Sequence, residues 1–575
     1  MNKFLRLIFI LSLVVVTSSC DIDEVITTAL PPTIVLDSQT GIYTVKQGRQ
    51  ITIAPEYESV EGATYRWLMN GEVLSTSPSL AFTGEEVGGY FITISVATEA
   101  GVAEEEIRVD VVDLEIPTIS IAGDNTLTVV VGTELSFSAT VRKTSLETTS
   151  SWSLNGQKVS SDPEYTFKAE TVGEYTITAT ASNEDGTHSD TVKVSVLNAE
   201  DMPLVWQFDR TEYHNVVGRK LLIKPAKVSD DKNVEYTWSI AGQSQPAGNQ
   251  SQFVFSADKT GEYQISATAT TLNGENRITI SHSFTVTIYE EGKYYRAKSG
   301  SSSAIWNKVF EYTPAPGQFI NELKTGGFDA THTTAEAVRL YAESRLGEGN
   351  WVSLGGFGGY IVVGFDHSID NTGGYDLGII GNAFDGSSEP GVVWVMQDEN
   401  GNGLPDDTWY ELSGSEAGVQ STVRDYAVTY YRPSGTGMPV QWSDNLGNRG
   451  EIDYLEQFHT QDYYYPLWIK EDSYTLIGTC LEPRNYDKSG NGTYWVNSHY
   501  DWGYVDNFSP TDFNSDDKAN LFKISKAIDF EGKAVNLTHI DFVKVQCAVN
   551  AKSGWLGELS TEVCGFYDNS LKNSK

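Results

Sequence analysis

A unit that occurs three times between residues 65 and 274 is the feature that most constrains the fold. Its copies read YRWLMNGE…EEVGGYFITISVATEAG, SSWSLNGQ…ETVGEYTITATASNEDG and YTWSIAGQ…DKTGEYQISATATTLNG. Trp67, Trp152 and Trp238 are 85 and 86 residues apart, and each precedes a Gly-x-Tyr motif. The motifs contain Gly88 and Tyr90, Gly173 and Tyr175, and Gly261 and Tyr263. Short alternating strands in units of this length, with one buried Trp each, predict antiparallel β-sandwiches.

The three units resemble the polycystic kidney disease (PKD) and immunoglobulin-like domains of bacterial surface proteins. The resemblance covers about residues 34–289 and implies modules at residues 34–113, 114–199 and 200–289. Two roles are open for such modules: a spacer that lifts another domain off a membrane, or ligand binding through their loops. The spacer is favoured, because the aromatic residues fall mainly on strand positions where a sandwich core requires them.

The character of the sequence changes at about Tyr289, and residues 290–575 hold nine of the thirteen tryptophans. A capping box at Thr333 and Glu336, followed by apolar residues at helical spacing, predicts one helix over residues 333–346. Six other stretches read as strands: YIVVGFD, YDLGIIGNAF, GVVWVMQD, YAVTYYRP, YTLIGTC and HIDFVKVQCAV. Without a blade-length repeat, they predict a jelly-roll-like β-sandwich over residues 290–575. We therefore expect a mainly β chain.

The N-terminus, MNKFLRLIFILSLVVVTSSC, has two basic residues, a short apolar run and small residues that end at Cys20. This pattern predicts an export signal over residues 1–19. Small residues before a Cys resemble a bacterial lipobox, and the acidic DIDE that follows resembles the surface-export signal of Bacteroidetes lipoproteins. The resemblance implies that Cys20 is lipidated, that residues 20–33 form a linker, and that the protein is exposed on the outer membrane. The alternative is a plain cleavable signal.

The charge of the chain excludes one class of partner. It has 77 Asp and Glu against 40 Lys and Arg, which gives a net charge of −37. Such a surface repels phosphate backbones and anionic lipid headgroups. We therefore expect no nucleic acid partner, and a membrane contact only through the lipid anchor.

The remaining cysteines, Cys480, Cys547 and Cys564, are too few for a disulfide scaffold and lack metal-ligand spacing. A bridge between Cys547 and Cys564 is one reading, and packing as small apolar residues is the favoured one. The chain contains neither HExxH nor GxSxG. We expect no catalytic residues and no enzyme activity.

The stretch QDENGNGLPDDTWYELSGSE at residues 397–416 has the residue types of a calcium loop. Alternating oxygen side chains followed by a glycine make up the first half of an EF-hand loop, and oxygen ligands suit Ca²⁺. The predicted ligands are Asp398, Asn400, Asn402, the carbonyl of Leu404, and Asp406 or Asp407. The twelfth position is Trp409 instead of the bidentate Glu, so no EF-hand helix is expected. A plain Asn and Gly turn is the alternative.

Two stretches combine many rings with Asp, Asn and His: FHTQDYYYPLWIKEDSY at 458–474 and YWVNSHYDWGYVDNF at 494–508. Strand cores bury every second ring, so about half of them are expected to be structural. Rings on loops usually mark contact surfaces for a large planar or amphipathic ligand. The predicted ligand-binding residues are Tyr464, Tyr465, Trp468, Trp495, His499, Tyr500, Trp502 and Tyr504.

The motifs SLGGFGGYIVVGFD, GNAFDGSSEPGVVWV, DENGNGLPDDTWYEL and IDFVKVQ…GELSTEV, in this order, resemble a family of bacterial cell-surface proteins. Together with the lipobox and the repeats, the layout is similar to that of the BtuH type of Bacteroides surface lipoproteins. This resemblance implies that the C-terminal domain binds vitamin B12 (cobalamin) or related corrinoids beside a TonB-dependent outer-membrane transporter.

Two other functions stay open at this point. A surface glycan-binding protein would also use exposed Trp and Tyr rings beside Asp and Asn, and an adhesin or structural surface protein would present them to another protein. A corrinoid requires a deep aromatic pocket, a glycan an open groove, and an adhesin a broad patch. In each case we expect a monomer.

Overall fold

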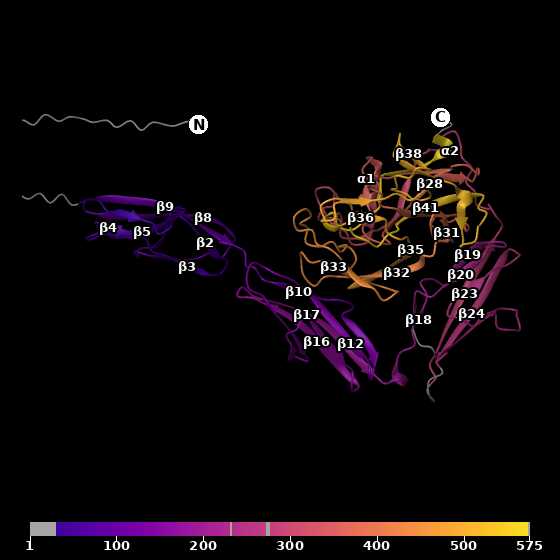
Figure 1. Cartoon of the computed structure of the whole chain (residues 1–575), viewed down its shortest axis with the longest axis horizontal. Coiled ribbons are helices and arrows are strands. Elements are labelled where there is room, and N and C mark those ends of the chain that lie inside the picture. The colour runs from indigo at the N-terminus through magenta and orange to yellow at the C-terminus, as the bar shows by residue number, and fades with distance from the viewer. Residues whose placement is uncertain (1–29, 230–232, 272–276, 573–575) are drawn as a thin grey trace, which may run out of the picture. The chain divides into compact units, whose positions relative to one another are not determined.

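The computed structural model describes residues 30–229, 233–271 and 277–572 (Figure 1). The chain divides into two compact units that meet between Glu115 and Ile116. The predicted signal peptide and Cys20 lie outside the described residues. Of the helices in these ranges, none combines the length and the apolar character that are needed to cross a membrane.

The first unit is a β-sandwich, which we call module 1. Its five-stranded sheet has the order β2-β9-β8-β5-β6, and the pairs β3-β7 and β1-β4 complete it. Ile92, Ile94 and Val109 on β8 and β9 are fully buried, which is the alternation expected of half-buried strands. The strands are β1 (Thr33–Val35), β2 (Ile42–Lys46), β3 (Gln50–Ile53), β4 (Glu56–Glu58), β5 (Thr64–Met69), β6 (Glu72–Ser75), β7 (Leu80–Thr83), β8 (Gly88–Thr98) and β9 (Gly101–Val112).

The second unit begins with two further sandwiches, modules 2 and 3, in which an early edge strand again runs parallel to the last strand. The parallel pairs are β2 with β9, β11 with β17 and β19 with β25. Module 2 comprises β10 (Thr118–Ile121), β11 (Thr126–Val130), β12 (Glu134–Arg142), β13 (Thr149–Leu154), β14 (Gln157–Ser160), β15 (Glu164–Lys168), β16 (Gly173–Ser182) and β17 (Thr187–Leu197). Module 3 comprises β18 (Trp206–Gln207), β19 (Glu212–Val216), β20 (Leu221–Ile223), β21 (Lys227–Val228), β22 (Val234–Ile240), β23 (Phe253–Phe255), β24 (Gly261–Thr271) and β25 (Thr279–Tyr289).

The repeated Trp and Tyr make the same two contacts in every module, as the spacing predicted. Each Trp is buried and donates its ring N–H to a carbonyl ten or twelve residues further on: Trp67 to Ser77 (2.9 Å), Trp152 to Asp162 (3.1 Å) and Trp238 to Gln250 (2.7 Å). Each Tyr hydroxyl donates to the carbonyl four residues upstream: Tyr90 to Glu86, Tyr175 to Thr171 and Tyr263 to Lys259. This second contact is the tyrosine corner of immunoglobulin-type sandwiches. The repeated rings are therefore core residues.

The C-terminal domain is built around a six-stranded antiparallel sheet of order β26-β28-β41-β30-β31-β40. A second sheet has the order β34-β33-β32-β35 and a third the order β38-β39-β29-β43. The elements are β26 (Lys308–Thr313), α1 (Ala335–Gly347), β27 (Val352–Ser353), β28 (Tyr360–Asp370), β29 (Leu377–Ile380), β30 (Gly391–Met396), β31 (Trp409–Leu412), β32 (Val423–Tyr431), β33 (Val440–Asp444), β34 (Arg449–Ile452), β35 (Ser473–Cys480), β36 (Asn485–Asp487), β37 (Trp495–Asn497), β38 (Phe513–Asn514), β39 (Ala519–Phe522), β40 (Ala527–Ile528), β41 (His539–Cys547), β42 (Glu562–Val563), β43 (Gly565–Asp568) and α2 (Asn569–Lys572). All six predicted strand segments overlap strands of this domain.

Both faces of the six-stranded sheet are covered. Val543 and Val545 of β41 point into the main core, where α1 and the third sheet pack against them. On the other face, Gln546 donates to the carbonyl of Ile477 (3.0 Å) on β35 of the second sheet. The result is a layered β-sandwich, in agreement with the predicted fold class.

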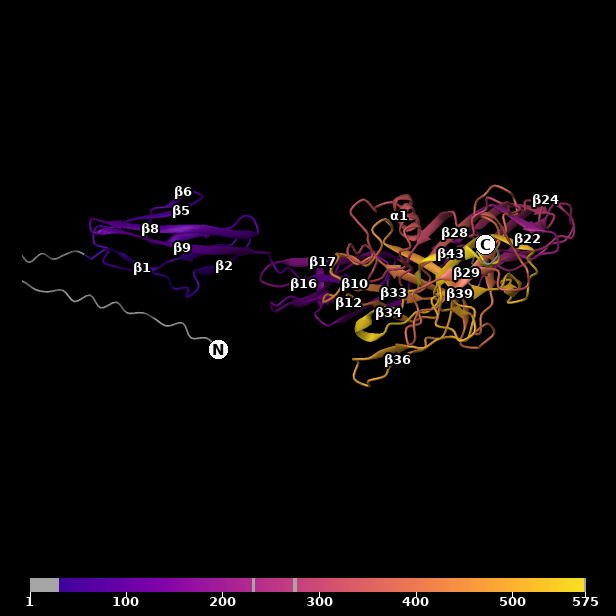
Figure 2. The ribbon, with the colours of Figure 1, turned by 90° about the horizontal axis from the view of Figure 1, so that it is seen from above.

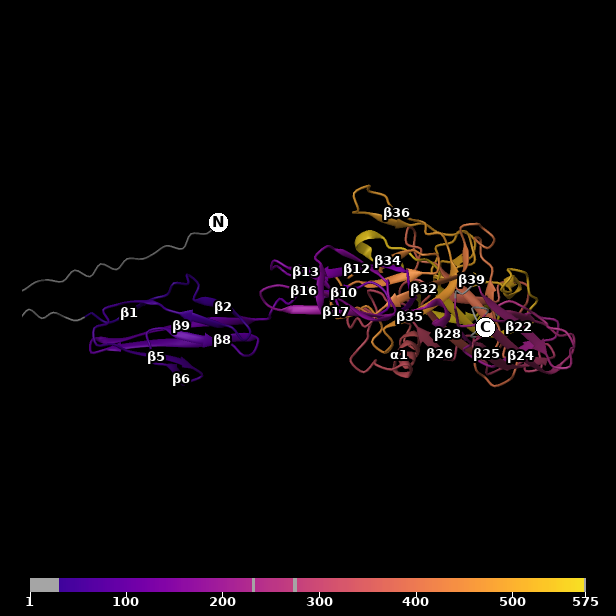
Figure 3. The same ribbon diagram turned by 90° about the horizontal axis from the view of Figure 1, so that it is seen from below.

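The predicted helix is present as α1 (Ala335–Gly347), but its N-cap differs from the prediction. Thr334 is the N-cap, and its hydroxyl accepts the amide of Ala337 at 3.2 Å. Glu336 pairs with Arg339 instead of closing a capping box with Thr333. Figure 2 and Figure 3 show α1 and the β36 hairpin on opposite edges of the C-terminal domain.

Arg219, in the turn after β19, joins module 3 to the C-terminal domain. Its buried guanidinium donates to Gln397 Oε1 at 2.6 Å and pairs with Glu291. Burial by itself would raise the pKa of Glu291, but Arg219, Gln397 and Thr538 bring it below its usual value. The carboxylate of Glu399 lies 3.5 Å from the same guanidinium. One buried cation of module 3 thus compensates two acidic groups of the C-terminal domain.

Replacing Arg219 with Met should keep the volume of the side chain but leave Glu291 without its counter-ion. We expect Arg219→Met to destabilise the second unit by about 3 kcal/mol, the usual cost of breaking a buried ion pair. Urea unfolding followed by tryptophan fluorescence measures this loss. Lys168→Met is the control, because Lys168 pairs with Glu134 in an exposed bridge that solvent screens, so its removal should change the urea midpoint much less. Equal urea midpoints for the two variants would contradict the assignment.

Candidate functional site

The loop predicted to bind calcium connects β30 to β31. Both carboxylate oxygens of Asp398 accept backbone amides, from Gly401 at 2.8 Å and from Gly403 at 3.0 Å. Gly403 has φ +75°, a left-handed conformation that other residues rarely adopt. The tight turn expected at this glycine is therefore present, and it folds the loop back over Asp398.

The remaining predicted ligands surround Asp406. Asn400 and Asn402 accept the amides two residues further on, and their side-chain N–H groups donate to Asp406 at 3.2 and 2.9 Å. Leu404 and Asp406 are exposed, whereas Asp407 is buried. The two candidates for the last acidic ligand therefore differ. Asp406 is exposed and accepts hydrogen bonds from the side-chain amides of Asn400 and Asn402, whereas Asp407 is buried.

The oxygen atoms of this loop fit a divalent cation. Asp407 Oδ2 accepts the amide of Glu399, but its Oδ1 and both carboxylate oxygens of Glu399 are buried without a hydrogen bond among the described residues. Burial first, and then repulsion by Asp406 and Asp398, raise the pKa of Asp407 to about 7. Hard anionic oxygen donors are the ligands that Ca²⁺ prefers.

Five of the eight rings predicted to bind a ligand lie in the core, and for them the prediction of a ligand-binding surface is wrong. They are Tyr464, Tyr465, Trp468, Tyr500 and Tyr504. Their polar atoms serve the fold, since Tyr464 donates to the carbonyl of His459 and Tyr500 to that of Glu482. Trp468 stacks on Phe328, with ring centres 5.7 Å apart. The turn formers in these stretches mark short irregular segments: Tyr464 and Tyr465 pack in a core cluster with the second sheet, and Tyr500 and Tyr504 pack in one that includes Val392 of β30.

The other three predicted residues are accessible but lie apart. His499 is exposed, whereas Trp495 and Trp502 are half-buried. Trp502 lines a cavity of about 180 Å³, and the ammonium of Lys526 lies 4.9 Å from the centre of its ring. Trp495 packs against Gly554, where a Cβ atom would come within 2.4 Å of the indole nitrogen.

A ring pair that the sequence did not reveal lies beside Trp495. Phe458 and Trp555 are 52% and 49% exposed, and their ring centres are 5.9 Å apart. Asn485 at the base of the β36 hairpin donates to the carbonyl of Lys552 (2.9 Å), which ties the hairpin to the segment that carries Trp555. We call Phe458, Trp495 and Trp555 the ring surface. Only the glycines that flank Trp555 in SGWLGE hint that this ring stands on a turn.

An open groove of about 480 Å³ borders the same segment. It runs between module 2 and the β33–β34 hairpin, and its lining includes Tyr431, Trp442, Arg449 and Lys552. Gln441 donates to Thr140 at 2.7 Å across this junction. Residues 550–552 therefore line an amphipathic groove, and the same segment carries the exposed ring of Trp555.

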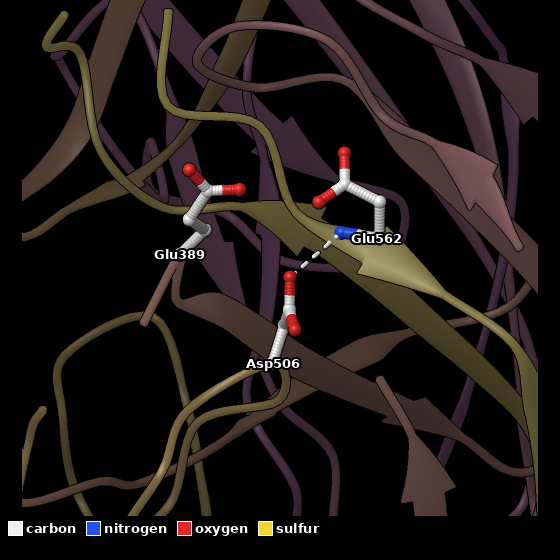
Figure 4. Close-up of side chains that lie close together, drawn as sticks. All are labelled: Glu389, Asp506 and Glu562. Carbon is white, nitrogen blue, oxygen red and sulfur yellow. Dashed lines mark hydrogen bonds between the residues drawn. The ribbon is translucent and has the colours of Figure 1, made fainter. Parts of the chain in front are cut away.

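Three carboxylates form a separate buried cluster (Figure 4). One oxygen of each of Glu389, Asp506 and Glu562 lies within 4.8 Å of the other two. Asp506 accepts the amide of Glu562 at 2.9 Å. Burial and mutual repulsion raise the pKa of Glu389 and of Asp506, and burial raises that of Glu562 to about 7. Protons retained by these carboxyl groups would reduce the repulsion among them without a metal ion, so we assign no ion to the cluster.

The raised pKa of Glu562 predicts how stability depends on pH. The folded state holds the proton of Glu562 more tightly than the unfolded state does. Protonated Glu562 therefore contributes fully to the stability of the fold below pH 4.5, and this contribution is lost as pH rises through about 7. Glu562→Gln keeps an acceptor for Ser560 and a permanent N–H beside Glu389. At pH 8 we expect this variant to exceed the original chain by about 2 kcal/mol in unfolding free energy, with no gain at pH 5.

Urea midpoints at pH 5 and pH 8 measure this difference. Glu164→Gln, at an exposed position of module 2, is the control and should follow the original chain at both values. Parallel pH profiles for Glu562→Gln and the original chain would show that the cluster does not retain the proton.

Comparisons with known proteins identify the first two modules. Residues 31–98 match the PKD-like domain family, and residues 118–196 match the PKD domain family. No curated protein matches the chain. The chain is thus a mainly β protein with PKD- and immunoglobulin-like modules of the type found in surface proteins.

Solved structures resemble the modules only distantly. The three N-terminal domains of the highly immunogenic outer capsid protein of bacteriophage RB49 are 15% identical, with 45% of this chain and 99% of that chain covered and a TM-score of 0.20. Fibronectin(III)-like modules of Clostridium thermocellum CbhA are 20% identical, with 30% and 97% covered and a TM-score of 0.18. An I-band fragment of titin is 12% identical, with 45% and 99% covered and a TM-score of 0.20. The TM-scores are too low for these likenesses to carry an argument about function.

Proposed function

We propose that the chain is a surface-exposed lipoprotein whose C-terminal domain captures a corrinoid, with cobalamin as the first candidate, for a TonB-dependent outer-membrane transporter. The lipid on Cys20 would hold it in the outer membrane, and the three modules would act as the spacer. The observation that carries the proposal is the ring surface beside the groove, where the exposed rings of Phe458 and Trp555 lie 5.9 Å apart and Trp495 of β37 packs against Gly554, next to Trp555.

The chemistry of this surface suits a corrinoid. A corrin has broad apolar faces, peripheral amides and, in cobalamin, a phosphodiester. Phe458 and Trp555 offer ring faces for the apolar part. Arg449 in the groove supplies a cation for the phosphodiester, and Asn550 and Glu451 supply hydrogen-bonding groups for the amides, whereas Lys552 already pairs with Asp453 at 2.6 Å.

The proposed role of the modules follows from their interiors. Their repeated Trp and Tyr rings belong to the sandwich cores, as the hydrogen bonds of Trp67 and Tyr90 within module 1 illustrate. A net charge of −37 repels anionic headgroups, which favours a chain that stands away from the membrane. A spacer is thus the simplest role for three modules of one topology.

Removing one ring tests the ligand surface. We expect cyanocobalamin to bind the chain from residue 21 onward with one-to-one stoichiometry in calorimetric titration. Trp555→Ala should weaken binding tenfold or more, because truncating a central aromatic contact costs about 2 kcal/mol. Tyr494→Ala is the matched control. Tyr494 is 56% exposed and lies just before β37, and its ring lies 5.4 Å from the ammonium of Lys488.

The same titration decides between ligands. Absence of binding at high micromolar cyanocobalamin would reject the corrinoid and direct the search to a glycan array. If Trp555→Ala and Tyr494→Ala lost the same affinity for cyanocobalamin, the ring surface would be rejected as the binding site, but cyanocobalamin would remain the ligand.

We also propose that the loop over residues 398–407 holds a structural Ca²⁺. Asp398, Asn400, Asn402, Asp406, Asp407 and the carbonyl of Leu404 would supply its oxygen ligands. The buried oxygen of Asp407 that lacks a hydrogen bond supports this assignment. The ion would offset the repulsion among the acidic side chains and stiffen the hairpin that carries Trp409.

Asp407→Asn tests the calcium proposal. At pH 7.5 we expect Ca²⁺ to raise the thermal midpoint of the original chain, since a ligand at a hundred times its Kd stabilises by about 2.7 kcal/mol. In chelator the variant should be the more stable of the two above pH 7, because burial raises the pKa of Asp407 to about 7 and ionisation then costs free energy. With Ca²⁺ the order should reverse.

Asp487→Asn is the control for this experiment. Asp487 accepts the amide of Gly492, five residues on, in the same way that Asp398 accepts Gly403, but its pKa is lowered by hydrogen bonds from Ser489 and Gly492. The Asp487→Asn variant should therefore respond to Ca²⁺ like the original chain. A calcium response that survives Asp407→Asn would reject the site.

A further inference from the structure

A cavity of about 310 Å³ opens over the six-stranded sheet around Lys544. Tyr360 and Val362 of β28 and Lys544 and Gln546 of β41 form its floor. Residues 475–477 of β35 form one wall, and Glu311, Pro405 and Trp409 complete the lining. The cavity lies within the C-terminal domain and contains none of the residues of the ring surface.

The ammonium of Lys544 is surrounded by rings. Its Nζ lies 4.9 Å from the centre of the Trp409 ring, 5.0 Å from that of Trp394 and 5.7 Å from that of Tyr360. The strand register explains this, because Lys544 lies opposite Trp394 of β30 and opposite Val362 of β28. Within the described ranges, Nζ has no hydrogen bond and no ion pair. A hydrogen-bond acceptor for this cation therefore has to come from the cavity.

The nearest carboxylate does not fill this role. Glu311 accepts hydrogen bonds from Tyr360 and from Thr313 (3.2 Å). Burial lowers the pKa of Lys544 to about 8, and the charge of Glu311 offsets only part of this effect. The lysine is thus cationic at neutral pH but poorly compensated, and an anion in the cavity would be stabilised by it.

A second polar group of the lining lacks a hydrogen bond. The side-chain N–H groups of Gln546 donate to the carbonyls of Gly358 (2.9 Å) and Ile477 (3.0 Å), which leaves its Oε1 as an acceptor. This oxygen is buried without a partner among the described residues. It lies against Gly478, where a Cβ atom would come within 2.2 Å of it, so a ligand hydroxyl would reach it only if the amide turned toward the cavity.

We propose that this cavity binds a small hydroxylated carboxylate of the hexuronic acid type. Its carboxylate would pair with Lys544 Nζ, and its ring would stack on Trp409 or Tyr360. A volume of about 310 Å³ lies at the small end of ligand cavities and suits one sugar unit better than a corrinoid. The site is independent of the corrinoid proposal.

The proposal is tested with glucuronic acid as the probe and tryptophan fluorescence as the signal. We expect the chain to bind glucuronate, to bind glucose at least tenfold more weakly, and to lose affinity as pH rises above about 8, where Lys544 becomes neutral. Lys544→Met should weaken glucuronate binding at least tenfold. Methionine fits among aromatic rings, so this variant is expected to fold.

Lys526→Met is the matched control. Lys526 also lies 4.9 Å from a tryptophan ring, that of Trp502, but it lines the cavity of about 180 Å³. The Lys526→Met variant should bind glucuronate with the same affinity as the original chain. Equal affinity of glucuronate for Lys544→Met and the original chain would overturn the proposal.

A second measurement uses the original chain and therefore does not depend on the folding of a variant. Acetic anhydride acetylates accessible amines, and mass spectrometry reports the extent at each lysine. Glucuronate at saturating concentration should slow acetylation of Lys544 at least fivefold and leave Lys526 unchanged. Equal acetylation of Lys544 with and without glucuronate would overturn the proposal.

Discussion

The pairing of β41 with β28 and β30 is the interaction on which the C-terminal domain depends. β41 lies between these two strands, and its Val543 and Val545 enter the main core. Its Asp541 accepts the amide of Asp398 at 2.8 Å and so holds the start of the acidic loop. Its Lys544 and Gln546 form the floor of the cavity on the opposite face. The core, the proposed calcium loop and the proposed carboxylate site thus share one strand.

The domain compensates its buried acidic groups in three different ways. Arg296 pairs with Asp541, and hydrogen bonds from His539, Ser368 and the amide of Asp398 keep the pKa of Asp541 low although burial would raise it. Glu389 and its neighbours in the buried cluster retain protons, because burial raises their pKa. Among the residues that the structure describes, Asp407 has neither an ion-pair partner nor a hydrogen bond for its Oδ1. This third case is the reason why we assign an ion to the loop and none to the cluster.

Aromatic residues serve opposite purposes in the chain. In the modules a ring in each strand pattern closes the core and donates one hydrogen bond, as Trp152 does to Asp162. In the C-terminal domain the same residue types also form an exposed surface at Phe458 and Trp555 and surround the ammonium of Lys544. Burial, and not residue type, separates a structural ring from one that is available to a ligand.

The sequence by itself determined the features that depend on local periodicity. The repeat around Trp67 predicted three sandwiches, alternating strands predicted the mainly β fold, and Gly403 predicted the turn of the acidic loop. Tertiary structure alone decided which rings are accessible: Tyr464 and Tyr500 are covered, whereas Trp555 on a short turn is not. It also brought Lys544 among three rings from three strands. The physical reason is that strand periodicity gives the two faces of a strand, but the packing of other sheets decides which face they cover.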